Sequence, residues 1–528
     1  MKINIIGAGL AGLSAALTLA ENGIKSNLIS VQQSERAQSV MAEGGINACL
    51  NTMGENDKIE YHYEDTLRGG VYLADPDAVR GLCEAAPGIV KKFASLGVPF
   101  EQNENGIIQR NFGGQKKKRT AYVKSSTGKM LMTALIDEVR KYEARGMVTR
   151  YPNHSLVRLI VKENRCFGAV VQNTYTKEIL SINGAVILAT GGLNGLFEGM
   201  TTGTTQNTSD AAAMLFSQGV ALSNLEMIQY HPTTIGIQGK RLLISEAARG
   251  EGGRLYILRS GKPWYFMEEK YPELKNLMPR DVVSAEMVTV SSLPECDDQV
   301  YLDMTGIEKS VWKTRLSDLR EQCIHYISLD PAKKPIPVSP GIHYFMGGVW
   351  VDKNHRTSVR NLYAAGECAC QYHGANRLGG NSLLGAVYGG QAAAKTSMNE
   401  SKENDIKADR AEENTADVSP AFARKICEIL YRSLPIVRNE SDMNNALSEL
   451  KALKSTAENQ VEMNRANLAL AVVQSAIERR ETRGAHKRTD YPERDDDNFK
   501  KQTVARLQNG KVEITFKEIG EDLSWKSP

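Results

Sequence analysis

The beginning of the chain alternates between short apolar runs and glycine-rich or polar turns, a pattern typical of a βαβ unit. Apolar residues dominate the strand predicted over Lys2 to Ile6, and a glycine-rich turn over Gly7 to Gly12 follows it. The apolar stretch from Leu13 to Glu21 predicts a helix, and Ser26 to Ser30 predicts a second strand. We therefore expect the chain to open with a strand, a tight turn, a helix and another strand.

The same strand pattern returns further along the chain. Leu156 to Val161 and Cys166 to Thr174 predict two paired strands. Ala185 to Thr190 is an uninterrupted apolar run that leads into Gly191 and Gly192. Such a run is expected for a parallel strand that is buried on both faces.

The remaining sequence divides into regions of different pattern. From about Thr234 to Gly341 the chain breaks into mixed short elements, which indicates an inserted domain, and near Asn361 to Gly366 the alternation of strand and glycine returns. Ser401 to Ser419 is strongly polar and predicts a solvated linker or a surface helix. From Ala421 to Ile477 apolar residues recur at helical spacing, which predicts a helical bundle.

Composition and charge fit a globular α/β protein and disfavour nucleic-acid binding. The chain of 528 residues is too long to form one simple hydrophobic core, so we expect about two or three domains. Hydrophobic residues make up 41% of the chain and glycines number 45, which argues against a disordered or fibrous protein. Lys and Arg number 65 against 62 Asp and Glu, and we find no basic stripe with interleaved aromatics. We expect the densest basic cluster, Lys116 to Arg119, to be a solvated loop.

The cysteines and the apolar runs indicate in which cellular compartment the protein is expected. The eight cysteines are scattered without a CxxC pair, so no disulfide framework, metal site or self-contained iron–sulfur cluster is expected, and reduced thiols fit the cytoplasm. The first strand begins so close to Met1 that we expect no signal peptide. No apolar stretch is long enough to span a bilayer. If the protein works at a membrane, we expect another subunit to hold it there.

The glycine turn carries the first candidate chemistry. Gly7, Gly9 and Gly12 form a GxGxxG motif between a predicted strand and helix, with Leu10 and Ala11 between the glycines. The first glycine permits the tight turn, the second lets the backbone approach a pyrophosphate, and the third lets the helix pack on the strand. The N–H groups at the helix start can bind the anion. The sequence therefore predicts a dinucleotide site.

Further motifs point to the nature of that dinucleotide. The second strand ends at Ser30, where an Asp or Glu would be expected to hold the ribose hydroxyls. Short motifs with the sequences AEGGI, ATGG, NTSD, AGE and NSLL begin at residues 42, 189, 207, 365 and 381. From residue 2 to about residue 500 these features resemble the flavoprotein subunits of fumarate reductases and succinate dehydrogenases, with L-aspartate oxidase as a close relative. The resemblance implies FAD as the cofactor. It implies further FAD-binding residues at Ser30, Ser39, Glu43, Gly44, Gly45, Ala189, Thr190, Gly191, Asp210, Glu367, Asn381, Ser382 and Leu383.

One residue departs from this resemblance. The quinone-linked members carry R-S-H-[ST], whose His is covalently bonded to the flavin, whereas this chain reads R-A-Q-S over Arg36 to Ser39. Gln38 cannot replace that His, because an amide nitrogen is not nucleophilic like an imidazole, and the first histidine of the chain is His62. The resemblance therefore predicts FAD that is bound non-covalently. In this family the loss of the covalent bond accompanies a lower flavin potential, which favours reducing fumarate over oxidising succinate.

Candidate substrate-binding residues follow from the same resemblance. Reduction of a C=C bond needs a hydride at one carbon, a proton at the other, and cations or donors that hold both carboxylates. His231 in QYHPT and His343 in GIHYF resemble the two His that contact carboxylates. Arg377 in ANRLGG resembles the Arg that grips a carboxylate in bidentate fashion. Phe112 matches an aromatic that lies over the substrate in some members, and a packed core Phe is the alternative.

A proton relay is also implied. Arg280 resembles the family's proton donor, and because an Arg pKa lies above about 12, we expect it to pass a proton during hydride transfer and to be refilled at once. Ser245, Glu246 and Arg249 resemble the motif [ST]-E-x-x-R. A Glu and an Arg three residues apart share a helix face, so we expect Glu246 to bridge Arg249 to Arg280, with a plain helix salt pair as the alternative. Ser245 keeps a hydroxyl that can meet a carboxylate.

Several functions remain open. The first is the flavoprotein subunit of a fumarate reductase, which reduces fumarate by hydride transfer from FAD N5, with an iron–sulfur partner and an anchor subunit on the cytoplasmic face of the inner membrane. The second is a stand-alone L-aspartate oxidase that makes iminoaspartate for NAD biosynthesis; the length and Gln38 favour it, but RLGGNSL from Arg377 differs from its usual RLASNSL. A succinate dehydrogenase subunit and a flavin-binding module without dicarboxylate chemistry are further alternatives. The motifs over Glu481 to His486 and Asp490 to Asp495 also match the first family, and we interpret them as mainly structural.

The fold expected from these patterns and the resemblance is α/β. A Rossmann-like FAD-binding domain is expected over residues 1–233 and 343–400, interrupted by an α+β capping domain over 234–342. A polar linker over 401–420 and a C-terminal helical domain with a tail over 421–528 complete the expected order.

Overall fold

A parallel five-stranded sheet forms the centre of the fold. The computed structural model describes residues 2–400 and 417–523, so most of the predicted linker, residues 401–416, lies outside the described residues. The strand order is β21-β12-β1-β2-β8, and each neighbouring pair is parallel. The strands span Lys2–Ile6 (β1), Lys25–Ser30 (β2), Val148–Pro152 (β8), Val186–Leu188 (β12) and Leu362–Ala364 (β21). The apolar run that was predicted as a buried parallel strand is β12, although its regular part is shorter than the run.

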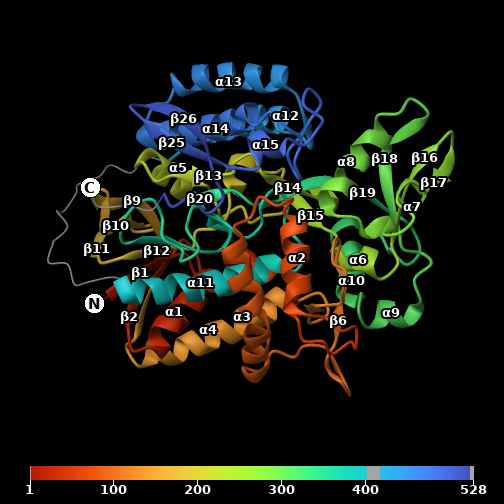
Figure 1. Ribbon diagram of the computed structural model, residues 1–528, viewed down its shortest axis with the longest axis horizontal. Coiled ribbons are helices and arrows are strands. Elements are labelled where there is room, and N and C mark those ends of the chain that lie inside the picture. Colours follow the sequence, from red (N-terminus) through yellow and green to blue (C-terminus); the bar gives the residue numbers. More distant parts are fainter. Residues whose placement is uncertain (1, 401–416, 524–528) are drawn as a thin grey trace.

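Helices cover this sheet and bring distant parts of the chain together (Figure 1). They are α1 (Leu10–Glu21), α2 (Ile59–Gly69), α3 (Pro76–Ser95), α4 (Thr127–Ala144) and α11 (Asn381–Glu400). α1 packs against both α11 and α4. A Cβ at Gly390 would lie 2.2 Å from the carbonyl oxygen of Ala11, so only glycine permits this approach of α11 to α1.

The first helix begins earlier than the sequence predicted. α1 begins at Leu10 rather than Leu13, because the last residues of the GxGxxG motif already adopt helical geometry after Gly9. The turn between β1 and α1 is therefore short, and the N–H groups of the first helical turn lie immediately beyond it.

An antiparallel three-stranded sheet lies next to the central sheet. It contains β9 (His154–Lys162), β10 (Arg165–Asn173) and β11 (Ile179–Asn183) in the order β11-β10-β9. β9 and β10 pair antiparallel, which confirms the predicted strand pair.

Two long strands lead out of the central region into a second core. β14 (Ile228–Ile237) and β19 (Ile336–Phe345) pair antiparallel in a six-stranded sheet of order β15-β14-β19-β18-β16-β17. The other strands are β15 (Lys240–Leu243), β16 (Arg254–Arg259), β17 (Lys262–Trp264) and β18 (Cys296–Asp303). Helices α6 (Ala247–Gly250), α8 (Arg280–Ser291), α9 (Lys309–Lys313) and α10 (Ser317–Ile327) belong to the same part of the chain. This part has an apolar cluster of its own and occupies the right side of Figure 1. We call it the cap.

The C-terminal part is helical but also contains a strand pair that the sequence analysis missed. Its helices are α12 (Pro420–Ser433), α13 (Glu440–Lys454) and α14 (Gln460–Glu478), as the helical spacing predicted. The predicted tail instead contains β25 (Gln502–Gln508) and β26 (Lys511–Lys517), which pair antiparallel and appear beside α14 in Figure 1. β25 also pairs with β13 (Leu222–Ser223), a contact across nearly three hundred residues of sequence that no local pattern reveals.

The basic run over Lys116 to Arg119 is not a solvated loop throughout, so that expectation was wrong for Arg119. Lys116 and Lys118 are exposed, but the Arg119 side chain has no exposed area. Its guanidinium lies 3.0 Å from Asp57 and 3.1 Å from Asp65. Two buried carboxylates compensate its charge at Nη2, which explains how a residue from a charged run enters the interior.

Candidate active site

A cavity of about 810 Å³ opens beyond the carboxyl ends of β1, β12 and β21 and extends to the cap. A crevice at this edge of a parallel sheet is the usual ligand site of such folds. Most of the predicted cofactor residues line it: Gly7, Gly9, Leu10, Ala11, Ser30, Gln38, Ser39, Glu43, Gly44, Gly45, Ala189, Thr190, Gly191, Asp210, Glu367, Ser382 and Leu383. Gly12 and Asn381 do not belong to this lining.

The geometry of the glycine turn explains its residues. Gly7 has a φ of +115°, and a Cβ there would lie 2.0 Å from the carbonyl oxygen of Ala189. A Cβ at Gly12 would lie 1.8 Å from the carbonyl oxygen of Gly7, so Gly12 lets α1 pack on the turn instead of touching a ligand. The N–H of Leu10 donates to Ser39 Oγ over 3.3 Å. The turn thus brings backbone and the N-terminus of α1 to the cavity wall.

Asn381 holds the start of α11 at the cavity although its own side chain does not line it. Its Oδ1 accepts hydrogen bonds from Asn47 Nδ2 at 2.7 Å and from His62 Nε2 at 3.0 Å, and its Nδ2 donates to Thr66 Oγ1 at 3.0 Å. Burial, aided by the charge of Arg119, lowers the pKa of His62 to about 3, so the imidazole is neutral. These bonds hold the start of α11, where Ser382 and Leu383 face the cavity.

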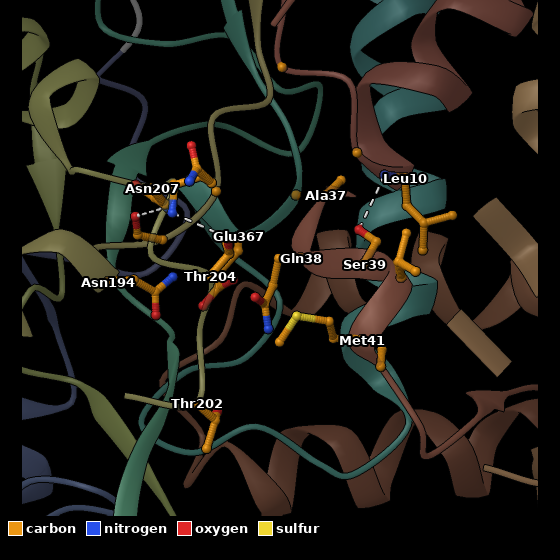
Figure 2. Close-up of a pocket in the computed structure, with 18 of the residues that line it drawn as sticks. Leu10, Ala37, Gln38, Ser39, Met41, Asn194, Thr202, Thr204, Asn207 and Glu367 are labelled. Atoms are coloured by element: carbon orange, nitrogen blue, oxygen red, sulfur yellow. Dashed lines mark hydrogen bonds between the residues drawn. The ribbon is translucent and has the colours of Figure 1, made fainter. Parts of the chain in front are cut away.

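Gln38 lies near the centre of the close-up of the cavity in Figure 2. It belongs to the short 3-10 helix η2 (Gln38–Met41), and Figure 2 shows it between that helix and the side chains of Thr204 and Glu367. Its Oε1 is buried and has no hydrogen-bond partner among the described residues, so it is free to meet a ligand. With the glycine turn and the start of α11, this orphan atom fits a bound dinucleotide with a polar head group.

Two acidic side chains at the cavity have unusual pKa values. Burial raises the pKa of Glu43 to about 8, although Gln322 Nε2 approaches its Oε1 at 3.4 Å; Asp318 adds to the rise. Burial likewise raises the pKa of Glu367 to about 7, against a hydrogen bond of 3.1 Å from the N–H of Phe345. Glu43 is therefore mostly protonated at neutral pH and can donate a hydrogen bond to a ligand.

At the cap side of the cavity two histidines face each other. His231 comes from β14 and His343 from β19, and their ring centroids lie 5.1 Å apart. His343 Nδ1 lies 2.8 Å from Thr202 Oγ1, while His231 Nε2 is buried without a partner among the described residues. Burial lowers the pKa of both imidazoles well below the ordinary value, and Arg280 adds to the effect. Both rings are therefore neutral at pH 7 and can offer an N–H without adding charge.

Arg377 supplies a cation at the same place. It is 3% exposed, and its guanidinium carbon lies 4.4 Å from the ring centroid of Tyr344. Its Nε is buried without a hydrogen-bond partner among the described residues. Burial, reinforced by the nearby charge of Arg280, lowers the pKa of Arg377 to about 9, so the side chain remains charged at pH 7. A buried cation with an unused donor is prepared for an anionic ligand.

The predicted relay residues are in contact. Glu246 Oε2 accepts hydrogen bonds from Arg280 Nε at 2.9 Å and Nη2 at 2.6 Å, and Glu246 Oε1 lies 3.8 Å from Arg249 Nη2. Glu246 directly precedes α6, a helix of only one turn, which still leaves it beside Arg249. Burial alone would raise the pKa of Glu246, but Arg280 and Arg249 lower it to about 2. The carboxylate is thus ionised and bridges the two guanidinium groups.

Phe112 and Ser245 also line the cavity, whereas Arg249 reaches it only through Glu246. Phe112 is buried, and the following residue, Gly113, donates its N–H to Glu246 Oε1 at 2.7 Å. The loop that carries Phe112 is therefore fastened to the relay.

Three residues at this site escaped the sequence analysis as functional candidates. Thr202 bonds to His343, Tyr344 lies beside Arg377, and Gln229 contacts Arg280. Gln229 and Tyr344 stand within the quoted motifs beside the histidines, so their position in the sequence was the available signal. Thr202 belongs to a threonine-rich loop whose approach to His343 depends on the pairing of Thr201 with Ile342.

Two features of the described residues, 2–400 and 417–523, concern membranes and metals. No helix within them is both long enough and apolar enough to cross a bilayer. They contain no group of three or more His, Cys, Asp or Glu side chains arranged to hold a metal ion.

Comparison with known proteins gives a consistent picture. Two family models match the chain, "FAD binding domain" over residues 3–383 and "Fumarate reductase flavoprotein C-term" over residues 459–526. The succinate dehydrogenase flavoprotein subunit of Bacillus subtilis is 37% identical, with 96% of this chain and 94% of that protein aligned. The fumarate reductase flavoprotein subunit of Haemophilus influenzae is 32% identical, with 98% and 94% aligned. A mutant chain of Escherichia coli quinol fumarate reductase superposes with a TM-score of 0.86 at 29% identity and covers 99% of this chain and 97% of its own.

Proposed function

Because this chain belongs to the family of succinate dehydrogenase and fumarate reductase flavoprotein subunits and is an FAD-dependent oxidoreductase, we propose that it interconverts fumarate and succinate and works as a fumarate reductase. The observation that carries the proposal is the convergence of His231, His343, Arg377 and Arg280 on one cavity. These groups can hold both carboxylates of a small dicarboxylate and supply a proton between them.

The charge of the site supports a dicarboxylate. The guanidinium groups of Arg249, Arg280 and Arg377 are positive, Glu246 is negative, and both histidines are neutral. Glu367, whose pKa is about 7, offsets part of this positive charge, and the remaining excess favours an anionic substrate such as fumarate or succinate. In a cavity that excludes water, this excess favours binding and polarises the double bond.

The proposed reaction converts the C=C bond of fumarate to a CH–CH bond. When bound and reduced, FAD supplies a hydride to one alkene carbon. Arg377 and the two histidines hold the carboxylates and withdraw electron density from the double bond. Arg280 donates a proton to the other carbon and is refilled through Glu246, whose two carboxylate oxygens contact Arg280 and Arg249. Glu246 also keeps the Arg280 guanidinium oriented during this transfer.

Two finer points rest on Gln38. We infer that FAD is bound non-covalently, because the amide of Gln38 stands where quinone-linked members carry the linking His, and His62, the first histidine of the chain, is engaged behind α11. Non-covalent binding favours fumarate reduction over succinate oxidation. Acid precipitation of the holoprotein should release yellow flavin into the supernatant, and flavin retained in the pellet would contradict the inference.

The names of the relatives support the inference that this chain functions as one subunit of a larger complex. The relatives from Bacillus subtilis and Haemophilus influenzae are called flavoprotein subunits, and the Escherichia coli protein is a quinol fumarate reductase. We infer that this chain receives electrons from an iron–sulfur subunit and reaches a membrane through an anchor subunit. Co-purification from its native cells with a cluster-containing protein would support this, and purification as an active single chain would oppose it.

One assay separates the candidate reactions. Purified, FAD-loaded protein should oxidise a chemically reduced viologen dye when fumarate is added, with two dye electrons consumed for each succinate formed. Succinate dehydrogenase is the second candidate, favoured by the 37% identity to the Bacillus subtilis protein, and faster turnover of succinate with an oxidised dye would support it. Peroxide from L-aspartate and O₂, without fumarate turnover, would overturn both.

A further inference from the structure

Gln229 connects the two functional arginines from behind the cavity. It lies in β14 with no exposed area and is not part of the cavity lining among the described residues. Its Oε1 accepts a hydrogen bond from Arg280 Nη1 at 3.2 Å. Its Nε2 donates to Asn376 Oδ1 at 2.8 Å and to the carbonyl oxygen of Arg377 at 2.9 Å. One amide thus holds the side chain of Arg280 and the backbone of Arg377.

The connection closes into a ring. Asn376 Nδ2 donates to Asp281 Oδ1 at 2.9 Å, and Asp281 follows Arg280 at the beginning of α8. The ring therefore joins the cap helix that carries Arg280 to the loop that carries Arg377, and among the described residues its connecting side chains do not belong to the cavity lining. A shift of either element disturbs both arginines together.

The amide suits this place better than a carboxylate or an apolar side chain. Glu246 holds Nε and Nη2 of Arg280, and Gln229 holds Nη1, so oxygen acceptors on two sides fix the plane of the guanidinium. A carboxylate at position 229 would offer no donor to the two oxygens of Asn376 and Arg377 and would bind the Arg280 proton more tightly. A thioether would make neither bond and would leave buried polar groups unpaired.

We propose that Gln229 is a positioning residue that keeps the guanidinium of Arg280 in register with the carboxylate-binding loop of Arg377. The proposal rests on the proposed fumarate chemistry and extends it, because it assigns the relative placement of proton donor and carboxylate clamp to a residue outside the cavity. Misplacement of a reacting group by about 1 Å can cost about 10²-fold in rate, so the effect should appear mainly in kcat.

The test uses the full FAD-loaded protein with fumarate and a reduced viologen dye. Gln229→Met is expected to lower kcat by about 10²-fold while KM changes by less than about fivefold. Asn376→Ala should lower kcat in the same direction, and the double variant should fall by less than the product of the two effects, because both changes break the same ring. FAD content and Tm are measured for every variant.

The matched control is Gln218→Met. Gln218 also donates and accepts through its side-chain amide, but both bonds go to the backbone of Leu159 in β9, away from both arginines. The control should leave kcat within about twofold of wild type. Gln229→Glu serves if the Met variant does not fold, because it keeps the size of the side chain and the acceptor for Arg280. It should retain FAD and still lose kcat.

The outcomes are distinguishable. An active wild type together with a Gln229→Met or Gln229→Glu variant that binds FAD and keeps wild-type kcat would overturn the positioning role alone. A loss of FAD and of Tm in step with kcat, in both substitutions, would also overturn it and assign Gln229 to folding. A wild type that turns over neither fumarate nor succinate would overturn the proposed function, and the positioning role with it.

Discussion

Arg280 is the residue on which the proposed chemistry depends most directly. Its guanidinium lines the cavity and is held by Glu246 and Gln229, neither of which can take over proton donation from the same position. General acid catalysis typically contributes about 10²- to 10⁴-fold to rate. A side chain that cannot donate a proton should therefore abolish most of kcat while the carboxylate-binding groups still hold the substrate.

The corresponding substitution is Arg280→Gln. We expect kcat for fumarate to fall by about 10³-fold or more, with FAD content unchanged, in the reduced-dye assay. Arg254→Gln is the control, since Arg254 also binds a carboxylate through two nitrogens, both at 2.7 Å from Glu268, but lies at the cap surface. Intact turnover in Arg280→Gln would restore the alternative of a flavin module without dicarboxylate chemistry.

The raised pKa of Glu43 predicts how the stability of the protein depends on pH. Its pKa rises from 4.5 to about 8 on folding because burial disfavours the charged form, so the native state binds more protons than the unfolded state between these values. Stability contributed by this group therefore falls as pH rises from 4.5 to about 8 and stays constant above. The Glu43→Gln variant should not show this loss of stability, because its amide does not ionise.

The measurement is Tm against pH for the purified protein. The Tm of Glu43→Gln relative to wild type should increase from pH 5 to pH 8.5, whereas Glu449→Gln, which removes a surface carboxylate paired with Arg432, should show no such trend. Parallel Tm curves for Glu43→Gln and wild type would show that Glu43 ionises normally.

At the scale of elements, α14 contributes to the cofactor site although it lies in the C-terminal part. Arg465 Nη2 donates to Asp210 Oδ1 at 2.7 Å and to the carbonyl oxygen of Thr208 at 2.9 Å. Asp210 begins α5 (Asp210–Ser217) and lines the cavity. α14 therefore holds the start of α5, and with it one wall of the cavity, in place.

Removal of this contact should weaken cofactor binding. Arg465→Met is expected to raise the Kd for FAD by about tenfold, the equivalent of about 1.4 kcal/mol, measured by the recovery of flavin fluorescence on dilution. The control is Arg432→Met on α12, which removes an exposed pair with Glu449 of α13 and should leave FAD affinity unchanged. Equal affinities of wild type and Arg465→Met would show that α14 does not support the cavity.

At the scale of the whole molecule, a buried charge network joins the C-terminal part to the centre of the fold. Glu226 Oε1 lies 2.7 Å from Arg479 Nε, and Glu481 contacts both Arg479 and Arg483 at 2.9 and 2.7 Å. Thr503 of β25 donates to Glu226 at 2.8 Å. These side chains are fully or almost fully buried, so each charge depends on its partners.

Breaking one partner leaves an uncompensated buried charge. Glu226→Gln should destabilise the protein by about 3–5 kcal/mol, seen as a lower Tm and as earlier proteolysis of the C-terminal part. Glu295→Gln removes a surface partner of Arg259 and should have little effect. A Tm of Glu226→Gln equal to that of the control would show that the network adds no net stability.

The sequence alone determined the local features of this protein. The spacing of apolar residues and glycines is a local signal that extends over a few residues. It predicts the strand, glycine turn and helix at the N-terminus, the strand pair β9–β10 and the C-terminal helices. Motifs of similar reach supplied the candidate residues, among them His231, Arg280, His343 and Arg377.

Only the tertiary structure decided how these residues act. It brought side chains from residue 43 to residue 377 to one cavity, buried Arg119 in spite of its basic surroundings, and paired β25 with β13. It also gave the same side-chain type opposite properties: the pKa of Glu43 rises to about 8, whereas that of Glu246 falls to about 2. The physical reason is that burial and the nearest charges come from residues remote in the chain, and a local pattern carries no record of them.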